Sequence, residues 1–400
     1  MLARVGSGRQ TRVVAHRYGR HVPTRTKRIL VGLAVGFAVG TAIGIVLLRP
    51  TGEPRAGLQG LGFVSEVYSG RVIGVEDIPC QGQPEPGVMC RRVAFSIEEG
   101  PDSGGTAAQE FVQTPSTPDL AEGDRILLAR DPQAPPGFQY RFVDRDRGWL
   151  LFGLAIAFAL TVVALGRLRG LTALAGLAVS IGVLLWFVLP AILDGRNPLA
   201  VAVVGSAAIA FLALYLAHGF TTMTTVALLG TLGALALTAG LASAAVELAE
   251  LSGFASEEAV VVQIGAARID LAGIILGGVV IGALGAIDDM TVTQASAVWE
   301  LRAANPRTSR RSLAAAGLRI GRDHVASTVN TLALAYAGAS MPVLLLLVLS
   351  RQPFTSVVSG EVLATEILRT LVGSIGLVAA VPLTTWLAAA AVPASRRPAE

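Results

Sequence analysis

Charged residues are scarce in this chain. They make up 15% of its 400 residues, whereas apolar residues make up 52%. A soluble domain of this length would carry more charge. The net charge is only +4, which gives no indication of a nucleic-acid partner. These absences exclude an ordinary soluble protein and favour a membrane protein, whose first partner is the lipid bilayer.

Metal-binding and nucleotide-binding patterns are also missing. The chain has 4 histidines and 2 cysteines, and no histidine lies near either cysteine, so we expect no metal site and no cofactor. No Walker motif is present, so we do not expect ATP to drive this chain directly. We also find no internal repeat of the kind that marks known transporter folds.

Long apolar runs recur along the sequence. A bilayer core of about 30 Å needs roughly 20 helical residues. The predicted fold is therefore an α-helical polytopic membrane protein with about eight transmembrane helices. No small-x-small cleavage site follows the first run, so we expect an uncleaved anchor rather than a signal peptide. The predicted spans are 29–48, 149–166, 171–193, 198–217, 223–244, 271–290, 325–349 and 364–391.

Arginine placement predicts the orientation. Arginines cluster in the N-terminal tail, 1–28, in the turn 167–169, in the loop after the sixth span and in the C-terminal tail, 392–400. With eight spans, all four groups fall on one side, which the positive-inside rule makes cytoplasmic. We therefore expect a multi-pass protein of the bacterial plasma membrane with both termini in the cytoplasm.

Residues 50–147 have a different character from the rest of the chain. Apolar runs become short and alternate with polar residues, as in "RRVAFSI" and "DRILLAR", and turn clusters such as "EEGPDSGG" separate them. This pattern predicts four to six short strands in a small β-barrel or sandwich, OB-like in type. The predicted organisation is thus a basic tail, an anchor at 29–48, an extracytoplasmic β-domain, a seven-helix bundle at 149–391 and a second tail.

Cys80 and Cys90 both lie in this β-rich segment and flank a loop of turn-forming residues. On the oxidising side of a membrane such a pair forms a disulfide. The alternative is two unpaired thiols, which the cytoplasmic orientation would require.

The sequence "GALGAIDDMTVTQASAVWEL" at 282–301 places two adjacent aspartates at the end of an apolar run. On a helix, Asp289, Thr293, Ser296 and Glu300 share one face, while Asp288 lies about 100° away. Ionisable residues inside a membrane bundle are usually paired and functional. We expect Asp289 to face the bundle interior. The alternative is a membrane boundary, where a carboxylate needs no function.

The next span carries a similar polar stripe. Asp323, Ser327 and Asn330 are spaced for one helical face, and Thr331 follows Asn330. A buried amide needs hydrogen-bond partners. Two interpretations of Asn330 remain open, namely structural bonding between helices and the lining of a solute pathway.

These motifs resemble the YibE/F-like family of bacterial multi-pass membrane proteins. The resemblance rests on "GALGAIDDMTVTQASAVWEL", on "GRDHVASTVNTLALAYAGASMPVLLLL" and on "GRLRGLTALAGLAVSIGVLLWFVLPAILDGRNPL", and it covers roughly 60–390. It implies an anchor, an outside β-rich segment and a helical bundle. Asp289, Glu300, Asp323 and Asn330 match the family pattern. Asp288 replaces a residue that is usually apolar, and "HGFTTMTT" lacks an expected lysine.

Three functions remain open from the sequence. The first is a permease for an unknown small solute, coupled to protons through an intramembrane aspartate. Its pathway residues would be Asp288, Asp289, Thr293, Glu300, Asp323, Asn330 and Thr331. The alternative is a non-transporting scaffold or envelope assembly factor, whose β-domain binds an envelope protein. An intramembrane enzyme is disfavoured, because adjacent aspartates cannot readily share one proton. An oligomer is compatible with each of these functions.

Overall fold

The computed structural model describes residues 24–51, 66–80, 89–115, 117–135, 137–255, 257–265, 269–349 and 353–392. Most of the two predicted tails, together with the stretches 52–65 and 81–88 of the β-rich segment, therefore lie outside the described residues. The chain divides into two compact units. One unit contains 56–165, and the other contains 1–55 with 166–400.

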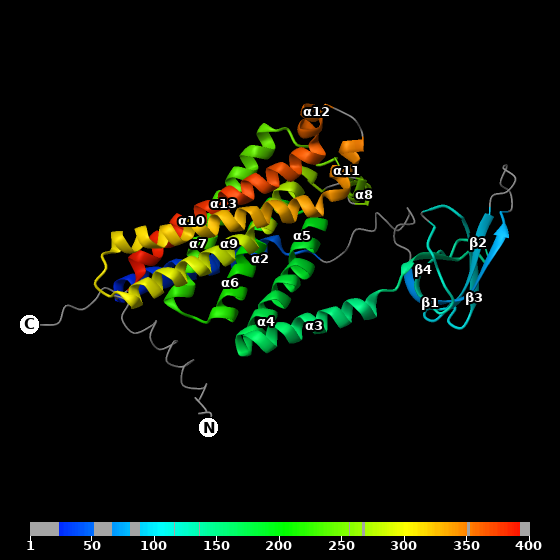
Figure 1. Ribbon diagram of the computed structural model, residues 1–400, viewed down its shortest axis with the longest axis horizontal. Helices are drawn as coiled ribbons and strands as arrows, with labels where there is room; N and C mark the ends of the chain where they lie inside the picture. Colours follow the sequence, from blue (N-terminus) through cyan, green and yellow to red (C-terminus); the bar gives the residue numbers. More distant parts are fainter. Residues whose placement is uncertain are drawn as a thin grey trace, which may run out of the picture. The chain divides into compact units, whose positions relative to one another are not determined.

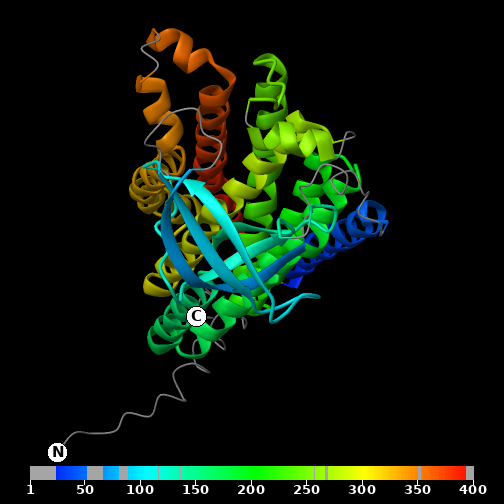
Figure 2. The ribbon, with the colours of Figure 1, turned by 90° about the vertical axis from the view of Figure 1, so that its right-hand side faces the viewer.

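The smaller unit is built on one antiparallel sheet of five strands. The strands are β1 (Glu66–Pro79), β2 (Met89–Ile97), β3 (Thr106–Val112), β4 (Arg125–Arg130) and β5 (Tyr140–Arg145). Their order in the sheet is β3-β2-β1-β4-β5. Register shifts near Gly74 and near Leu128 bend the long β1 and the β4–β5 pair. The sheet curls as a result, as Figure 2 shows, and forms a half-barrel rather than a two-layered sandwich.

Alternation along the strands builds the core of this half-barrel. Val93, Phe95 and Ile97 of β2 point inward with Ile126 and Leu128 of β4. The two outermost strands approach each other through side chains, since the rings of β3 and β5 meet edge to face at 5.8 Å. The described part of the segment thus folds around its own core.

Cys80 and Cys90 are joined by a disulfide. The bond connects the end of β1 to the start of β2, whose last paired residues are Pro79 and Met89. It therefore closes the connection between these two strands.

The helices carry most of the chain. In order they are α2 (Thr24–Leu48), α3 (Gly148–Gly166), α4 (Leu168–Val183), α5 (Leu189–Leu193), α6 (Pro198–His218), α7 (Thr222–Leu248), α8 (Glu257–Gly265), α9 (Leu271–Ala304), α10 (Arg310–Ala339), α11 (Met341–Leu349), α12 (Phe354–Ser359) and α13 (Glu361–Ala391). A π-helical turn at Leu184–Val188 joins α4 to α5 just before Pro190, which has no N–H to donate. Several helices begin after a residue whose side chain caps the helix, such as Asn197 before α6 and Asp270 before α9.

Among the described residues, seven helices are long and apolar enough to cross a membrane. The predicted span 325–349 is instead the bent pair α10 and α11, which meet at 64° and raise the number to eight if they count as one span. Pro342 at the start of α11 explains why the helix breaks there. Helix α3 has no buried residue, and it groups with the β-rich unit rather than with the bundle.

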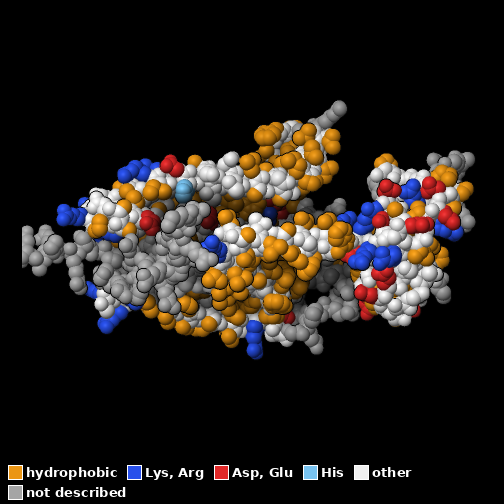
Figure 3. Space-filling model, turned by 60° about the horizontal axis from the view of Figure 1, so that its bottom comes forward, with side chains coloured by type: hydrophobic (Ala, Val, Ile, Leu, Met, Phe, Trp, Pro, Cys, Tyr) orange, Lys and Arg blue, Asp and Glu red, His pale blue; other side chains and the backbone are white. Residues whose placement is uncertain are grey.

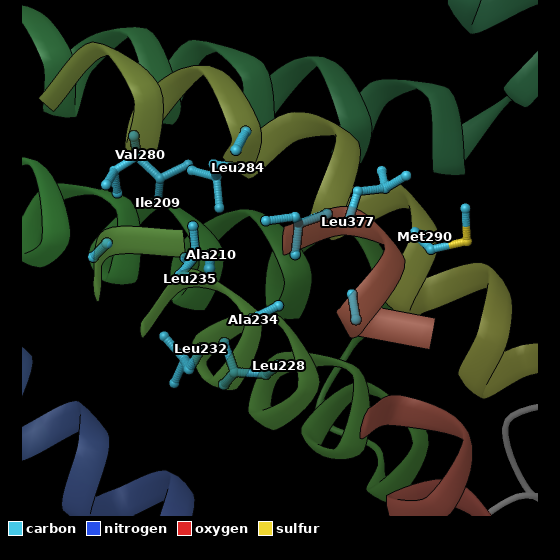
Figure 4. Close-up of a cluster of buried hydrophobic side chains, with 14 of the residues drawn as sticks. Ile209, Ala210, Leu228, Leu232, Ala234, Leu235, Val280, Leu284, Met290 and Leu377 are labelled. Carbon is cyan, nitrogen blue, oxygen red and sulfur yellow. The ribbon is translucent and has the colours of Figure 1, made fainter. Parts of the chain in front are cut away.

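Three long helices form the centre of the bundle. Figure 1 shows α7, α9 and α13 running side by side, and α6 and α10 pack around them. Their core is apolar, and its buried residues include Leu228 and Leu235 of α7, Leu284 of α9 and Leu377 of α13 (Figure 4). This core holds the polar residues described below in fixed places.

The outer surface of the bundle is also apolar. Figure 3 shows hydrophobic side chains over much of its visible face, with Lys and Arg side chains at the end where α9 finishes and α10 begins. Arg307, Arg310 and Arg311 are exposed at this end. A broad apolar surface with basic residues at one end is typical of a protein that lipid surrounds.

Candidate functional site

Helix α9 places the two adjacent aspartates on different sides. Asp288 is half-buried against α7, whereas Asp289 is exposed. Our prediction that Asp289 faces the bundle interior is therefore wrong, and Asp288 takes that position. The predicted separation of about 100° between neighbouring side chains explains why only one of them can face inward.

Packing of α9 explains which aspartate is turned inward. The fully buried face of this helix carries Ile287, Gln294 and Val298, with Met290 almost fully buried beside them. Large side chains recur there every three or four residues, so this face fills the space against α7 and α13. Asp289 lies on the opposite side of the helix, and its exposure follows from the position of those large residues.

Asp288 is held by hydroxyl groups. The Oγ1 of Thr231 on α7 lies 3.4 Å from Asp288 Oδ1 and 2.7 Å from Thr291 Oγ1. The Thr291 hydroxyl also reaches the backbone carbonyl of Asp288 at 3.0 Å. Both threonines are fully buried. No ion pair to Asp288 occurs among the described residues, and its carboxylate accepts from the neutral Thr231 hydroxyl.

A second polar group lies one to two turns further along α9. Gln294 is fully buried, and its Nε2 donates to the carbonyl of Gly317 at 2.6 Å and to Thr385 Oγ1 at 2.8 Å. These bonds connect α9 to α10 and α13. A side chain at Gly321 would collide with Val381 and with Gln294, so glycine is needed for this close approach.

Small residues also allow α7 and α13 to approach each other closely. A Cβ at Gly230 would collide with the Thr384 hydroxyl, and one at Gly376 would collide with the Thr238 hydroxyl. We call the resulting line of polar side chains the polar seam. It consists of Thr231, Thr238, Asp288, Thr291, Gln294, Thr384 and Thr385.

The other sequence-predicted residues lie away from the polar seam. Thr293 is half-buried, while Glu300 is exposed. Asp323, Asn330 and Thr331 are exposed on α10, and the Thr331 hydroxyl bonds within its own helix to the Ser327 carbonyl at 3.0 Å.

The buried side of α10 explains why Asp323, Asn330 and Thr331 are exposed. Leu318, Val325 and Val329 of α10 pack against the core instead. Among the described residues, no hydrogen bond or ion pair joins the α10 stripe to either aspartate.

Sequence reasoning missed the contributions of α7 and α13. The threonines of α7 gave no signal, because Thr is common in apolar helices and usually bonds its own backbone. Glu366 and Arg369 did give a signal, since both are charged residues within the last apolar run. They form an ion pair at 2.8 Å.

The described bundle also contains a large apolar groove, of about 880 Å³, away from the polar seam. Leu30 and Ala34 of α2 line it together with Phe211 and Leu212 of α6. An apolar lining of this kind suits an acyl chain more than a polar solute. Among the described residues, no group of three His, Cys, Asp or Glu side chains is placed to hold a metal ion.

Comparison with known proteins identifies the family. Residues 154–394 match the YibE/F-like protein family, which is more than half of the chain, and the chain belongs to that family. No curated protein and no solved structure matches the chain. The match covers the whole polar seam.

Proposed function

We propose that this YibE/F-like protein is a permease for a small solute, and that Asp288 takes up and releases a proton in each transport cycle. The observation that carries this proposal is the inward-facing carboxylate of Asp288, which accepts from the Thr231 hydroxyl and forms no ion pair with any other described residue. A carboxylate inside a membrane bundle is a site for a proton relay or for substrate binding. Family membership and the apolar helices support a membrane location.

The hydroxyls beside Asp288 can serve both protonation states. A threonine hydroxyl has one proton and also accepts hydrogen bonds. When Asp288 is ionised, Thr231 donates to it. When Asp288 is protonated, its own O–H donates to Thr231, and Thr231 turns its proton toward Thr291 Oγ1 at 2.7 Å or toward the Ala227 carbonyl at 3.1 Å. Rotation of these hydroxyls alone therefore adapts the hydrogen bonds of Asp288 to either protonation state.

The arrangement of helix ends supports the orientation that we propose. Leu30 of α2 packs with Trp299 of α9, Leu313 of α10 and Ala389 of α13. The beginning of the described chain and its end therefore lie at the same end of the bundle as the exposed arginines of the α9–α10 loop. The positive-inside rule makes this end cytoplasmic.

The five-stranded sheet follows α2 and precedes α3 in the chain, so we propose that the sheet lies outside the cell. The Cys80–Cys90 disulfide supports this placement, because disulfides persist in oxidising compartments.

The two adjacent aspartates of α9 allow a matched test of the permease function. Solute profiles of a deletion strain would first identify a solute whose accumulation changes, and uptake of that solute would be measured in cells that express each variant at equal levels. We expect Asp288→Asn to abolish uptake that depends on a pH gradient. Asp289→Asn, which makes the same change one residue away, should leave it intact. Equal activity of the two variants would contradict the assignment of Asp288.

A scaffold or assembly factor is the second candidate, and we propose an envelope protein as its partner. The compact β-rich unit favours it, because this unit has its own core and surface ion pairs such as Arg71–Glu98 at 2.8 Å. A scaffold would keep its activity in Asp288→Asn and lose it when 55–145 are deleted. If the protein is instead a permease, we expect Asp288→Asn to lose activity.

A further inference from the structure

An arginine lies within the last candidate span. Arg369 is eight residues after the start of α13 at Glu361, which places it about 12 Å along the helix. Its side chain is 27% exposed and that of Glu366 is 25% exposed. Charged residues are rare inside membrane spans and mark pathways for ions or substrates.

The hydrogen bonds of Arg369 leave one side of its guanidinium unused. Nη1 donates to Glu366 Oε1 at 2.8 Å. Nε is buried and has no hydrogen-bond partner among the described residues. Nε and Nη2 together form the flat edge that holds both oxygens of a carboxylate. Glu366 thus occupies the end of the fork and leaves this edge for another acceptor.

Glycines of α9, which carry no side chain, lie next to that edge. A Cβ at Gly278 would lie 3.5 Å from Nη2 and 3.9 Å from Nε of Arg369. One turn later, a Cβ at Gly282 would lie 2.5 Å from the Tyr336 hydroxyl of α10. The guanidinium edge and the phenol therefore both face a helix surface without side chains.

A further donor without a partner lies one turn away on α13. Thr365 precedes Arg369 by one turn of α13, and its Oγ1 is buried without a hydrogen-bond partner among the described residues. A buried donor without an acceptor costs free energy, so natural proteins rarely keep one without a reason. Two such donors on one face of α13 indicate a group that accepts hydrogen bonds there.

We propose that Arg369 binds the carboxylate of a small monocarboxylate solute through its Nε and Nη2 atoms. Tyr336 and Thr365 supply further hydroxyl donors at the same place. Glu366 already balances the charge of Arg369, so one added carboxylate leaves a single net negative charge. A phosphate dianion would leave two such charges, and it is the less favourable ligand inside an apolar bundle.

The identity of this anion as the transported solute rests on the permease function proposed above, whereas its binding does not. Gly278 and Asp288 are ten residues apart on α9, about 15 Å along the helix. A proton on Asp288 would balance the charge of the carboxylate. Transport of the two together then moves no net charge across the membrane.

Thermal unfolding of the full chain in detergent tests the binding site, with sodium propionate as the probe and sodium chloride at equal ionic strength as the reference. We expect propionate to raise the unfolding midpoint of the unchanged protein by about 2–4 °C, and the rise to saturate with concentration. Arg369→Lys keeps the charge but lacks the flat edge, so it should lose the rise. Gly278→Ala should lose it because its methyl group would lie against the guanidinium edge and exclude the carboxylate.

Gly285→Ala is the matched control for the glycine variant, because a Cβ there meets nothing within 4 Å. It should keep the full response to propionate. The proposal is overturned if the unchanged protein shows no saturating rise or if Arg369→Lys shows the same rise. A larger rise with sodium phosphate would overturn the carboxylate assignment.

Asp288→Asn separates this inference from the permease. It should respond to propionate like the unchanged protein. If it does so and also transports normally, the binding site stands and the proposed function fails. If Asp288→Asn loses transport while no variant responds to propionate, the proposed function stands and the binding site fails.

Discussion

Packing between α7 and α13 predicts a large effect of one methyl group at Gly230. In Gly230→Ala, the new Cβ would collide with the Thr384 hydroxyl and lie 3.1 Å from Thr384 Cβ. Both helices are held by the core around them, so neither can move away freely. Overpacking of this kind costs about 1–3 kcal/mol. The higher helix propensity of alanine offsets roughly 0.5–1 kcal/mol of that cost.

The net expectation for Gly230→Ala is a loss of about 1–2 kcal/mol, or roughly 2–6 °C in the unfolding midpoint of the chain in detergent. Gly240→Ala on the same helix is the control, because Gly240 is exposed and a Cβ there meets nothing within 4 Å. It should be neutral or slightly stabilising. Adding Thr384→Ala to Gly230→Ala should recover part of the loss, since the two sites are coupled. Equal midpoints for Gly230→Ala and Gly240→Ala would refute the close packing of α7 against α13.

Three further predictions concern single interactions. Thr231→Val removes the donor to Asp288 and should reduce pH-dependent solute uptake at least tenfold, whereas Thr231→Ser keeps the hydroxyl and should retain most of it; equal uptake by the two variants would contradict the hydroxyl's role. Hydrogen bonding from the Ala121 backbone holds the pKa of Asp124 below its usual range. The stabilising contribution of Asp124 is therefore present above the unfolded-state pKa of about 4 and is lost as the pH falls through the lower folded-state value. Asp124→Asn should make the unfolding of the β-rich unit less dependent on pH on the acid side, and an unchanged pH profile would contradict this. Reduction of the Cys80–Cys90 bond should destabilise the β-rich unit by about 2–3 kcal/mol, measured by denaturant unfolding with and without reductant, and no change in the midpoint would show that the bond constrains little.

Long apolar runs made the candidate spans predictable, because span length depends only on bilayer thickness. The α10–α11 bend was not predicted, although Pro342 was visible as a break signal. A proline can kink a helix, end it or leave it intact within a bundle, and only the neighbouring helices decide among these outcomes.

The site was predicted less well than the fold. Helical periodicity correctly placed Asp289 and Asp288 on different faces, but it does not state which face meets the rest of the bundle. That choice depends on how Ile287 and Gln294 pack against α7 and α13, which is information from distant parts of the chain. The positive charge of Arg369 within an apolar run could have been noticed in the sequence. Its guanidinium edge, which is not used by Glu366, could be recognised only from the structure.

Infrared difference spectroscopy of the reconstituted full chain tests the role of Asp288 most directly, because a protonated carboxyl group has its own C=O stretching band. We predict that a pH titration of the unchanged protein and of Asp289→Asn shows one such band that is absent in Asp288→Asn. A spectrum in which Asp288→Asn keeps every band, and Asp289→Asn loses one, would contradict it.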